Sequence, residues 1–590
     1  MMRARLIAWA SLLTVWSMTA ASSVSAQAPK VVGDWEGNLK IPSGIELRLV
    51  IHVIEKGKAL TSTMDSPDQG SNGLKVDETV FKDGDLTLTL KQINGSFAGK
   101  IDEKGETIAG KWSQNGETWP LTLNRVDPAK AKAMAIPKEF EGLWEGKLAA
   151  GAGIELRVVL QVTKDKDGAL KAVFRSPDQI DTDFVASAVT LKGKAASFAV
   201  KLIAGSFSGT LNDAKTELTG KWKQGAAIIP LTFKKVEKET PVKRPQTPQP
   251  PFPYESENVS YQNPDAKNKL VGTLTKPKGA GPFPVVLLIT GSGQQDRDET
   301  LFKHKPFLVL ADALTRRGVA VLRVDDRGVG GSTGSAAKAT SADFAHDVHA
   351  GIVYLKTRKD IDPKRIGLMG HSEGGLIAPM VAADHPDEVA FIVLLAGPGL
   401  DGSAIIKMQS TLILKAMDVK EDMIKAQETL IDELIMIAKS ETDDTQAAKK
   451  LKAAAKKVVD AMPKEAREAA GDDASSAAQP RVAMFASPWF RFFLSFDPAP
   501  TLAKVKCPVL AVNGEKDLQV PPKEDLEAIA KALKQGGNTR FVTKELPGLN
   551  HLFQTSKTGS PAEYGAIEET FAPSALKLIG DWIVETAGVH

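Results

Sequence analysis

The sequence predicts a multidomain chain in which two tandem antiparallel β modules, each small and barrel-like, precede a larger α/β domain. Three observations predict it: an internal repeat within the first 236 residues, a proline-rich run after the repeat, and a second half in which apolar runs alternate with helices. At 590 residues, the chain is also too long to fold around a single hydrophobic core. We therefore expect several separate cores.

The composition is that of an ordinary globular protein, with 42% hydrophobic and 25% charged residues. The formal net charge is only +3, which gives no reason to expect a nucleic-acid partner. Cys507 is the single cysteine, so no disulfide can form within the chain.

Residues 1–26 have the order of a secretory signal. Two arginines precede an apolar run from Leu6 to Ala21, and small residues precede Gln27. We expect cleavage near Gln27 and a product in the periplasm or outside the cell, without stable membrane insertion. An uncleaved membrane anchor is the alternative, but the apolar run is short and interrupted by Ser and Thr.

A repeat divides the first half into two β modules, at 27–127 and 137–236. GDWEGNL at 33–39 returns as GLWEGKL at 142–148, and other segments such as GIELR and GKW return at the same spacing. Alternating apolar residues separated by turn signals predict about eight antiparallel strands in each copy. The pattern therefore indicates a tandem duplication of a small barrel or curved sheet.

The Gly-x-Trp opening of each module is similar to that of lipocalin-like barrels. This resemblance implies a small apolar ligand for the β modules, whereas an interior filled by side chains is the alternative. His52 is the one histidine of this half, and its place in a strand predicts a structural role.

A proline-rich linker is expected at 237–253, where proline recurs six times. Such a run favours extended polyproline II and makes a semi-rigid spacer. A ligand for an SH3-type domain is the alternative. The linker places the start of the last domain at residue 254 and its end at residue 590.

The second half is predicted to hold a mostly parallel sheet of the doubly wound kind. Its apolar runs are unbroken, which indicates strands covered on both faces, and helices at 307–317 and 342–355 lie between them. The runs are Pro284–Thr290, Val319–Val324, Arg365–Gly370, Val389–Gly397, Cys507–Gly514 and Arg540–Leu546. In such sheets, ligand chemistry takes place at the carboxyl ends of the strands.

Ser372 is the predicted nucleophile. It stands in Gly-His-Ser-Glu-Gly at 370–374, between a strand run and a helical segment, where flanking glycines leave room for a sharp turn that lifts the hydroxyl above the sheet. A serine needs a base to remove its proton, and the base needs an acid to orient it. We expect these partners further along the chain, because this type of site orders them serine, acid, histidine.

His551 is the predicted base, because it follows the last strand run, whereas His385 is too near in sequence and His590 is the final residue. Asp517 is the predicted acid, since it lies just past the end of the Cys507–Gly514 run. Asp525 and Glu515 are the substitutes if Asp517 is a solvated turn residue.

An oxyanion hole is expected from backbone amides. One donor is the amide of Glu373, which follows the nucleophile, and the other comes from the loop at 290–294. In that loop Ser292 is favoured and Gly293 is the second choice. The alternative is that the glycines of this loop only form a turn.

Several motifs together resemble the bacterial EstD-type carboxylesterases of the α/β-hydrolase superfamily. They are GSGQQDRDE at 291–299, DDRGVGGS at 325–332, GHSEGG at 370–375, and the NGEKD and GLNH segments. The resemblance runs from Tyr254 to the C-terminus and implies an α/β-hydrolase domain that cleaves small-molecule esters with neither a metal nor an organic cofactor. Thr290 departs from the pattern, because many esterases carry histidine there.

Two other functions remain open. Members of this group also resemble serine peptidases of the prolyl-oligopeptidase type, so a peptidase or aminopeptidase acting on small peptides is the second hypothesis. A third, from another class, is a binding protein whose β modules recognise an envelope or carbohydrate ligand.

More than a hundred residues separate the runs that end at Gly397 and begin at Cys507, which predicts a helical lid at about 400–500. A flexible break is expected at Gly471–Pro480. Near the end of the lid stand Trp489, Phe490 and Phe493. These aromatic residues either form the wall of the acyl pocket or pack in the interior of the lid.

Overall fold

The structure is a computed structural model that describes residues 31–589 except 41–45, 58, 67–70, 115–116, 127–136, 150–154, 165–169, 204, 225–226, 442 and 462–478. The predicted signal at 1–26 and most of the predicted break at Gly471–Pro480 lie outside the described residues. Within the described part, no helix has the length and apolar character needed to cross a membrane. The chain divides into two compact units, the first of which holds the first β module.

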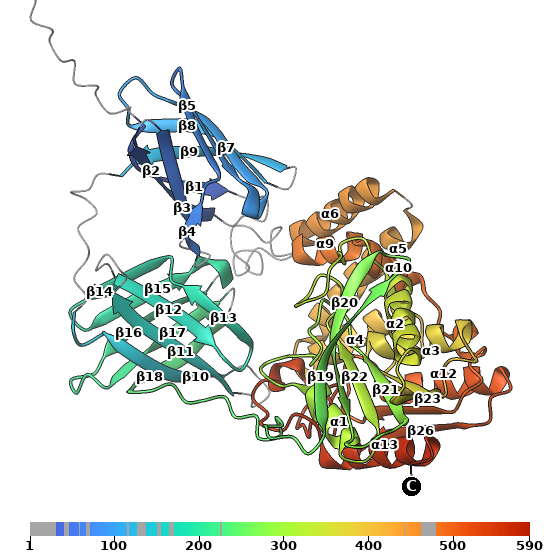
Figure 1. The fold of residues 1–590 in the computed structure, drawn as a ribbon. Helices are drawn as coiled ribbons and strands as arrows, with labels where there is room; N and C mark the ends of the chain where they lie inside the picture. The colour runs from blue at the N-terminus through green and yellow to red at the C-terminus, as the bar shows by residue number, and fades with distance from the viewer. Residues whose placement is uncertain are drawn as a thin grey trace, which may run out of the picture. The chain divides into compact units, whose positions relative to one another are not determined.

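The first module is an antiparallel half-barrel sheet (Figure 1). Its order is β4-β3-β2-β1-β9-β8-β7-β6-β5, so the first and last strands of the module pair with each other. The described residues form nine strands rather than the expected eight, because the stretch after residue 66 contributes two short ones. The strands are β1 (Gly33–Lys40), β2 (Glu46–Lys56), β3 (Ala59–Ser66), β4 (Ser71–Lys75), β5 (Glu78–Lys82), β6 (Asp85–Leu90), β7 (Gly95–Ile101), β8 (Thr107–Gln114) and β9 (Glu117–Arg125).

The second module has the same strand order in its own sheet, β13-β12-β11-β10-β18-β17-β16-β15-β14. Its described residues again form nine strands, each equivalent to a strand of the first module. They are β10 (Gly142–Ala149), β11 (Glu155–Lys164), β12 (Leu170–Ser176), β13 (Ile180–Val185), β14 (Ala188–Lys192), β15 (Ala195–Val200), β16 (Gly205–Leu211), β17 (Glu217–Gln224) and β18 (Ala227–Val236).

Alternation of side chains builds the interior of each module. In β6, Leu86, Leu88 and Leu90 are buried and the residues between them face outward, as the two-residue period of a strand requires. Large aromatic rings at equivalent positions are fully buried: Trp35, Phe97 and Trp112 in the first module, and Trp144, Phe207 and Trp222 in the second.

Equivalent polar contacts hold the opening tryptophans. Trp35 Nε1 donates to the carbonyl of Val31 at 2.8 Å, and Trp144 Nε1 donates to the carbonyl of Phe140 at 3.0 Å. His52 in β2 contacts a carboxylate with each ring nitrogen, Asp34 at 2.7 Å and Asp65 at 3.2 Å. Pairing of both nitrogens with neighbouring strand residues is what a structural histidine requires.

The last domain is an α/β-hydrolase-like fold built on an eight-stranded sheet of order β19-β20-β22-β21-β23-β24-β25-β26. The strands from β21 to β26 are parallel and correspond to the six runs read from the sequence. The strands are β19 (Glu255–Asn263), β20 (Asn268–Lys276), β21 (Phe283–Ile289), β22 (Ala320–Val324), β23 (Ile361–His371), β24 (Phe391–Leu395), β25 (Val509–Gly514) and β26 (Phe541–Leu546).

An antiparallel hairpin of β19 and β20, which the sequence analysis did not predict, extends the parallel strands at β22. Exposed residues alternate with buried ones along β19. A strand covered on only one face does not give the unbroken apolar run by which the other strands were recognised.

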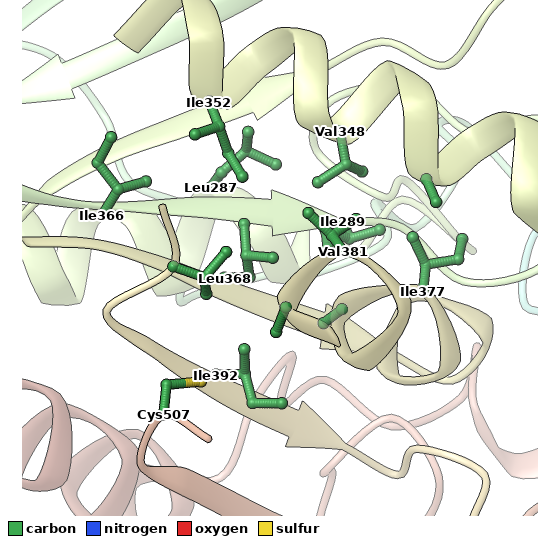
Figure 2. Packing of buried hydrophobic residues seen from close by; sticks show 14 of the residues in the cluster. Leu287, Ile289, Val348, Ile352, Ile366, Leu368, Ile377, Val381, Ile392 and Cys507 are labelled. Atoms are coloured by element: carbon green, nitrogen blue, oxygen red, sulfur yellow. The ribbon is translucent and has the colours of Figure 1, made fainter. Parts of the chain in front are cut away.

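Helices cover both faces of this sheet. On one face, α2 (Ser341–Lys356), α3 (Glu373–Asp384) and α12 (Pro522–Gln535) enclose a core, and on the other α1 (Pro306–Thr315) and α13 (Pro573–Thr586) enclose a second one. Figure 2 shows Val348 and Ile352 of α2 and Ile377 of α3 packed over Leu287 and Leu368 of the strands. These cores fix the positions of the strand ends and of the loops that leave them.

A helical insertion, defined here as residues 402–495, joins β24 to β25. Its described helices are α4 (Gly402–Ala416), α5 (Glu421–Ser440), α6 (Asp444–Ala461), α9 (Gln479–Ala486) and α10 (Pro488–Ser495); the short α11 (Ala499–Leu502) follows. Ile431, Leu434 and Ile435 of α5 pack against Phe485 of α9 and Phe490 of α10. The insertion therefore has a small core of its own, while its action as a lid stays a prediction.

The proline-rich linker is bound to the α/β domain through polar contacts. The Arg244 guanidinium donates to the carbonyl oxygens of Phe302, Gly565 and Ile567 at 2.7–3.2 Å. The Gln246 side chain bonds the backbone of Thr570 and Phe571. The linker therefore lies against the domain over these residues instead of standing free of it.

Candidate active site

Ser372 occupies a sharp turn between β23 and α3. Its backbone has φ 52° and ψ −117°, a conformation that L residues rarely adopt. The turn is held by hydrogen bonds from Ser372 N to the carbonyl of Leu395 at 2.8 Å and from Gly375 N to the carbonyl of Ser372 at 2.9 Å. Strained backbone enforced by its surroundings is typical of a nucleophile at the end of a strand.

The glycines beside Ser372 are required by close backbone approach. A Cβ on Gly370 would lie 1.9 Å from the carbonyl oxygen of Gly374, and a Cβ on Gly374 would lie 2.2 Å from that of Ile289. A larger residue at 374 would push the turn away from β21, and one at 370 would push the start of α3 away from the end of β23. The glycines of the Gly-His-Ser-Glu-Gly motif are therefore required by lack of space for a side chain, as the sequence predicted.

His551 and Asp517 meet at the carboxyl end of the sheet. His551 Nδ1 donates to Asp517 Oδ2 at 2.7 Å, and both residues are buried. The other oxygen of Asp517 accepts from the amides of Gln519 at 2.7 Å and Val520 at 3.0 Å. Because this carboxylate is fixed by two amides, it holds the imidazole with Nε2 as the nitrogen left to exchange a proton.

The two substitute acids have other partners. Asp525 Oδ1 accepts from the amides of Gly399 at 2.7 Å and Leu400 at 3.0 Å, and burial raises the pKa of Asp525 to about 7. Glu515 accepts from the amide of Gly548 at 2.7 Å. Of the three carboxylates considered from the sequence, Asp517 is the one that contacts His551.

A second histidine links the turn of Ser372 to the loop of His551. His371 Nε2 donates to the carbonyl of His551 at 3.0 Å, and the two rings lie 4.8 Å apart. Among the described residues, Ser372 Oγ itself makes no hydrogen bond, so proton transfer from Ser372 to His551 stays a prediction. The structure brings the two loops together through the neighbour of the serine.

His371 also forms a buried pair with Glu299, a residue that the sequence analysis did not single out for the site. His371 Nδ1 contacts Glu299 Oε1 at 2.9 Å, and the same oxygen accepts from the Gly291 amide at 2.8 Å. Burial lowers the pKa of His371, but the Glu299 charge and the hydrogen bonds outweigh it, so the net pKa is raised. The GSGQQDRDE motif contained the signal, since Glu299 ends it.

The loop at 290–294, which is expected to supply an oxyanion donor, is held by hydrogen bonds to the side chain of Asp326. Thr290 Oγ1 donates to Asp326 Oδ1 at 2.8 Å, and the Gln295 amide donates to the other oxygen at 2.9 Å. Burial raises the pKa of Asp326 to about 7, so a neutral form is accessible near neutrality. Thr290, at the position where many esterases carry histidine, thus fixes the loop through a buried carboxyl group.

The candidate donors themselves lie in two places. Ser292 and Glu373 line one cavity together with Ser372, whereas Gly293 lines a neighbouring cavity and has φ +96°. Glu373 is the first residue of α3, at the helix end where amides are free to bind an anion. Its carboxyl group accepts from Ser341 Oγ at 2.6 Å and Trp489 Nε1 at 2.8 Å, and burial raises its pKa.

A cavity of about 420 Å³, called here the Ser372 cavity, lies between the turn and the helical insertion. It is lined by Ser372 and by the three aromatic residues singled out in the sequence, Trp489, Phe490 and Phe493. Its volume is in the range of small-molecule sites, and most of its lining side chains are apolar. Phe490 also belongs to the core of the insertion, so its side chain both packs in that core and lines the cavity.

Among the described residues, one group of side chains is arranged so that it could hold a metal ion. His349, His385 and Glu388 have ligand atoms within 4.8 Å of one another, with His349 Nε2 at 3.3 Å from Glu388 Oε2. His349 lies in α2, and the other two follow the end of α3. None of the predicted catalytic residues belongs to this group, and Glu388 also pairs with Lys356 at 3.3 Å.

The sequence of this domain matches known hydrolases. Residues 267–543 match the family model described as X-Pro dipeptidyl-peptidase (S15 family). The chain is 27% identical over 298 residues to Esterase EstD of Thermotoga maritima, a match that covers 50% of this chain and 61% of that protein. The chain thus spans about three fifths of the length of this relative.

Solved structures similar to the domain include the Pyrococcus furiosus esterase Pf2001, at 15% identity and a TM-score of 0.32, covering 56% of this chain and 92% of that one. Another is Est1E of Butyrivibrio proteoclasticus with bound ferulic acid, at 18% identity and a TM-score of 0.31, covering 55% and 96%.

The strand order, the strained serine turn and the buried histidine–aspartate pair define the class as a serine hydrolase with an α/β-hydrolase domain. The family match agrees with this class. Within this class, the chain is similar to Esterase EstD over half of its own length.

Proposed function

We propose that this chain hydrolyses carboxylic esters through an acyl-enzyme intermediate, with Ser372 as nucleophile, His551 as base and Asp517 as orienting acid. The observation that carries the proposal is the 2.7 Å bond between His551 Nδ1 and Asp517. The loop of His551 is in turn bound to His371, the residue before the strained Ser372. The bond to Asp517 fixes the tautomer in which Nε2 can accept the serine proton.

In the proposed reaction, Ser372 Oγ attacks the ester carbonyl while His551 accepts its proton. The tetrahedral oxyanion is held by the amide of Glu373 and by the loop amides, with Ser292 favoured over Gly293 because it lines the same cavity as Ser372. Collapse of this intermediate expels the alcohol, which takes the proton from His551. Water, activated by His551, then attacks the acyl-serine and releases the acid.

The acyl group is proposed to occupy the Ser372 cavity, against Trp489 and Phe493. These side chains come from the helical insertion, so the insertion acts as a lid that contributes the pocket wall. A small-molecule ester is therefore the expected substrate, and no step of this mechanism uses a cofactor.

Peptide hydrolysis is the second candidate, and the specific observation that favours it is the match to the dipeptidyl-peptidase family. The same three residues would serve, but His551 would have to protonate an amine leaving group. Comparing kcat/KM for p-nitrophenyl esters with that for aminoacyl p-nitroanilides separates the two activities.

Export and ligand binding by the modules remain proposals from the sequence. We expect the protein recovered from the periplasm or the medium to begin at Gln27, which N-terminal sequencing would test. A small ligand for the β modules, or an envelope or carbohydrate ligand, would be tested by retention of the inactive S372A protein on immobilised polysaccharide.

The experiment that tests the mechanism is Ser372→Ala, with Ser495→Ala as a matched control at an exposed serine of α10. Ser372→Ala is expected to lower kcat for p-nitrophenyl acetate by at least about 10³-fold. Covalent labelling by a fluorophosphonate is expected in the wild type and the control but not in S372A. Retained turnover and labelling in a folded S372A protein would refute the assignment.

A further inference from the structure

Several polar residues that the proposed mechanism does not use line the Ser372 cavity. Two of them are Arg481 of α9 and Gln427 of α5. Both belong to the helical insertion and line the cavity together with Ser372. Their lack of partners points to the chemistry of the substrate.

The Arg481 guanidinium makes no hydrogen bond or ion pair among the described residues. Although the residue as a whole is exposed, burial of its guanidinium lowers the pKa of Arg481, and no anion acts in the opposite direction. Several other partly enclosed arginines have anionic or carbonyl partners: Arg297 pairs with Asp325 and Arg327 with Asp347, and Arg244 donates to backbone carbonyls. An unpaired guanidinium in a cavity is a ready site for a carboxylate.

Gln427 provides independent evidence for a missing acceptor. Its amide nitrogen Nε2 is buried and has no hydrogen-bond partner. A buried donor without a partner costs free energy, and such groups in binding sites are commonly satisfied by a ligand. An acceptor atom on the substrate would supply the missing bond.

The cavity offers no anion of its own to these donors. Glu373 is the acidic residue among its lining residues, and its carboxyl group already accepts from Ser341 and Trp489. Burial raises the pKa of Glu373, which favours its neutral form. The cavity therefore combines a mainly apolar wall with a cation and an unmatched amide donor.

We propose that Arg481 and Gln427 bind a free carboxylate on the substrate, so that the preferred esters carry a carboxylate in addition to the ester that Ser372 cleaves. This inference rests on the proposed function. The guanidinium would bind the carboxylate with paired N–H groups, and Gln427 Nε2 would donate to the same group or to a neighbouring oxygen.

The test compares pairs of esters whose members differ by a single carboxylate group. On the acyl side the pair is 4-nitrophenyl hemiglutarate and 4-nitrophenyl butyrate, and on the alcohol side it is 4-butyryloxybenzoate and phenyl butyrate. In the wild type, kcat/KM is expected to favour the charged member of one pair by at least about tenfold. The pair that shows this preference identifies the side of the ester that carries the carboxylate.

Substitutions assign the preference to the two residues. Arg481→Gln is expected to remove it through a rise in KM for the charged ester that is larger than any change in KM for the neutral ester. Arg481→Lys should retain part of the preference, because ammonium keeps the charge but not the fork of donors. Gln427→Leu should weaken it by a smaller factor. Arg316→Gln, a change just after α1 at an arginine paired with Asp312, should leave it unchanged.

The outcomes separate this inference from the proposed function. If the wild type cleaves neutral esters through Ser372 but shows no charged preference, or if Arg481→Gln retains the preference, carboxylate recognition is wrong and the esterase proposal stands. If neither ester of a pair is cleaved and S372A labels like the wild type, the proposed function fails. A thermal melt of each variant excludes unfolding as the cause of a change.

Discussion

The indole Nε1 of Trp489 donates a 2.8 Å hydrogen bond to Oε1 of Glu373, the residue that follows the proposed nucleophile. This bond joins α10 of the helical insertion to the first residue of α3. Because Glu373 is buried, the bond is made in a region from which water is largely excluded, and the same burial raises the pKa of Glu373. The insertion and the serine turn are therefore coupled by a direct polar contact.

Trp489→Ala is expected to alter acyl-chain selectivity, because it removes a ring from the wall of the Ser372 cavity. The ratio of kcat/KM for p-nitrophenyl octanoate to that for p-nitrophenyl acetate should change by at least about fivefold, consistent with a difference of roughly 1 kcal/mol in apolar contact. Trp489→Phe should retain most of the wild-type ratio, since an aromatic ring remains.

Phe492→Ala is the matched control for this prediction, because Phe492 lies on the same helix and stacks on Phe496. It should leave the ratio unchanged. A wild-type ratio in Trp489→Ala would mean that the aromatic residues serve packing alone.

Asp517→Asn is expected to lower kcat by about 10³-fold or more, because the amide no longer holds His551 in the required tautomer. Asp525→Asn, the matched change at a buried carboxyl group bonded to other amides, should keep kcat within a few-fold of the wild type. Steady-state kinetics with p-nitrophenyl butyrate makes the comparison. A larger loss of kcat in the Asp525 variant than in the Asp517 variant would show that Asp517 is not the orienting acid.

The stability of the domain is expected to depend on pH through Asp525. Burial raises its pKa from the ordinary value of 3.8 to about 7. The folded state thus binds the proton more tightly than the unfolded state, so this group's contribution to the free energy of unfolding is full below about pH 4. It declines as pH rises to about 7.

Asp525→Asn removes this titration. The free energy of unfolding of the variant minus that of the wild type should be larger at pH 8 than at pH 4, by about 1–3 kcal/mol. Urea unfolding followed by tryptophan fluorescence at both pH values measures the difference. An equal difference at the two pH values would show that Asp525 does not titrate in this range.

Arg244→Ala is expected to release the linker from the α/β domain. The change leaves the carbonyl oxygens of Phe302, Gly565 and Ile567 without their donor, at an expected cost of about 1–3 kcal/mol. Limited proteolysis should then cut within residues 237–253 faster than in the wild type.

Lys243→Ala is the neighbouring control, since its exposed ion pair with Glu568 at 3.4 Å contributes little. Equal proteolysis rates in Arg244→Ala and Lys243→Ala would show that Arg244 does not anchor the linker.

Local patterns in the sequence predicted much of this structure. The six unbroken apolar runs are the parallel strands, and the glycines around Ser372 predicted its turn, because a steric requirement over five residues is visible in those residues alone. The positions of His551 and Asp517 after strand runs likewise predicted the edge of the sheet at which they lie. Their catalytic roles stay predictions.

Other features depended on distant parts of the chain. The β19–β20 hairpin, the buried pair of Glu299 and His371, and the bond between Trp489 and Glu373 join residues whose contact follows from strand order and helix packing. No periodicity within a short window contains that information, since periodicity reports which face of an element is buried and not what buries it.

The sequence by itself thus determined the type of each domain and the local geometry of the serine turn, because apolar period and glycine placement act through neighbouring residues. Only the tertiary structure decided which of three candidate carboxylates holds His551 and which polar groups line the Ser372 cavity without partners. The physical reason is that a hydrogen bond of 2.7 Å is fixed by where two loops end in space, and the cores on both faces of the sheet set those ends.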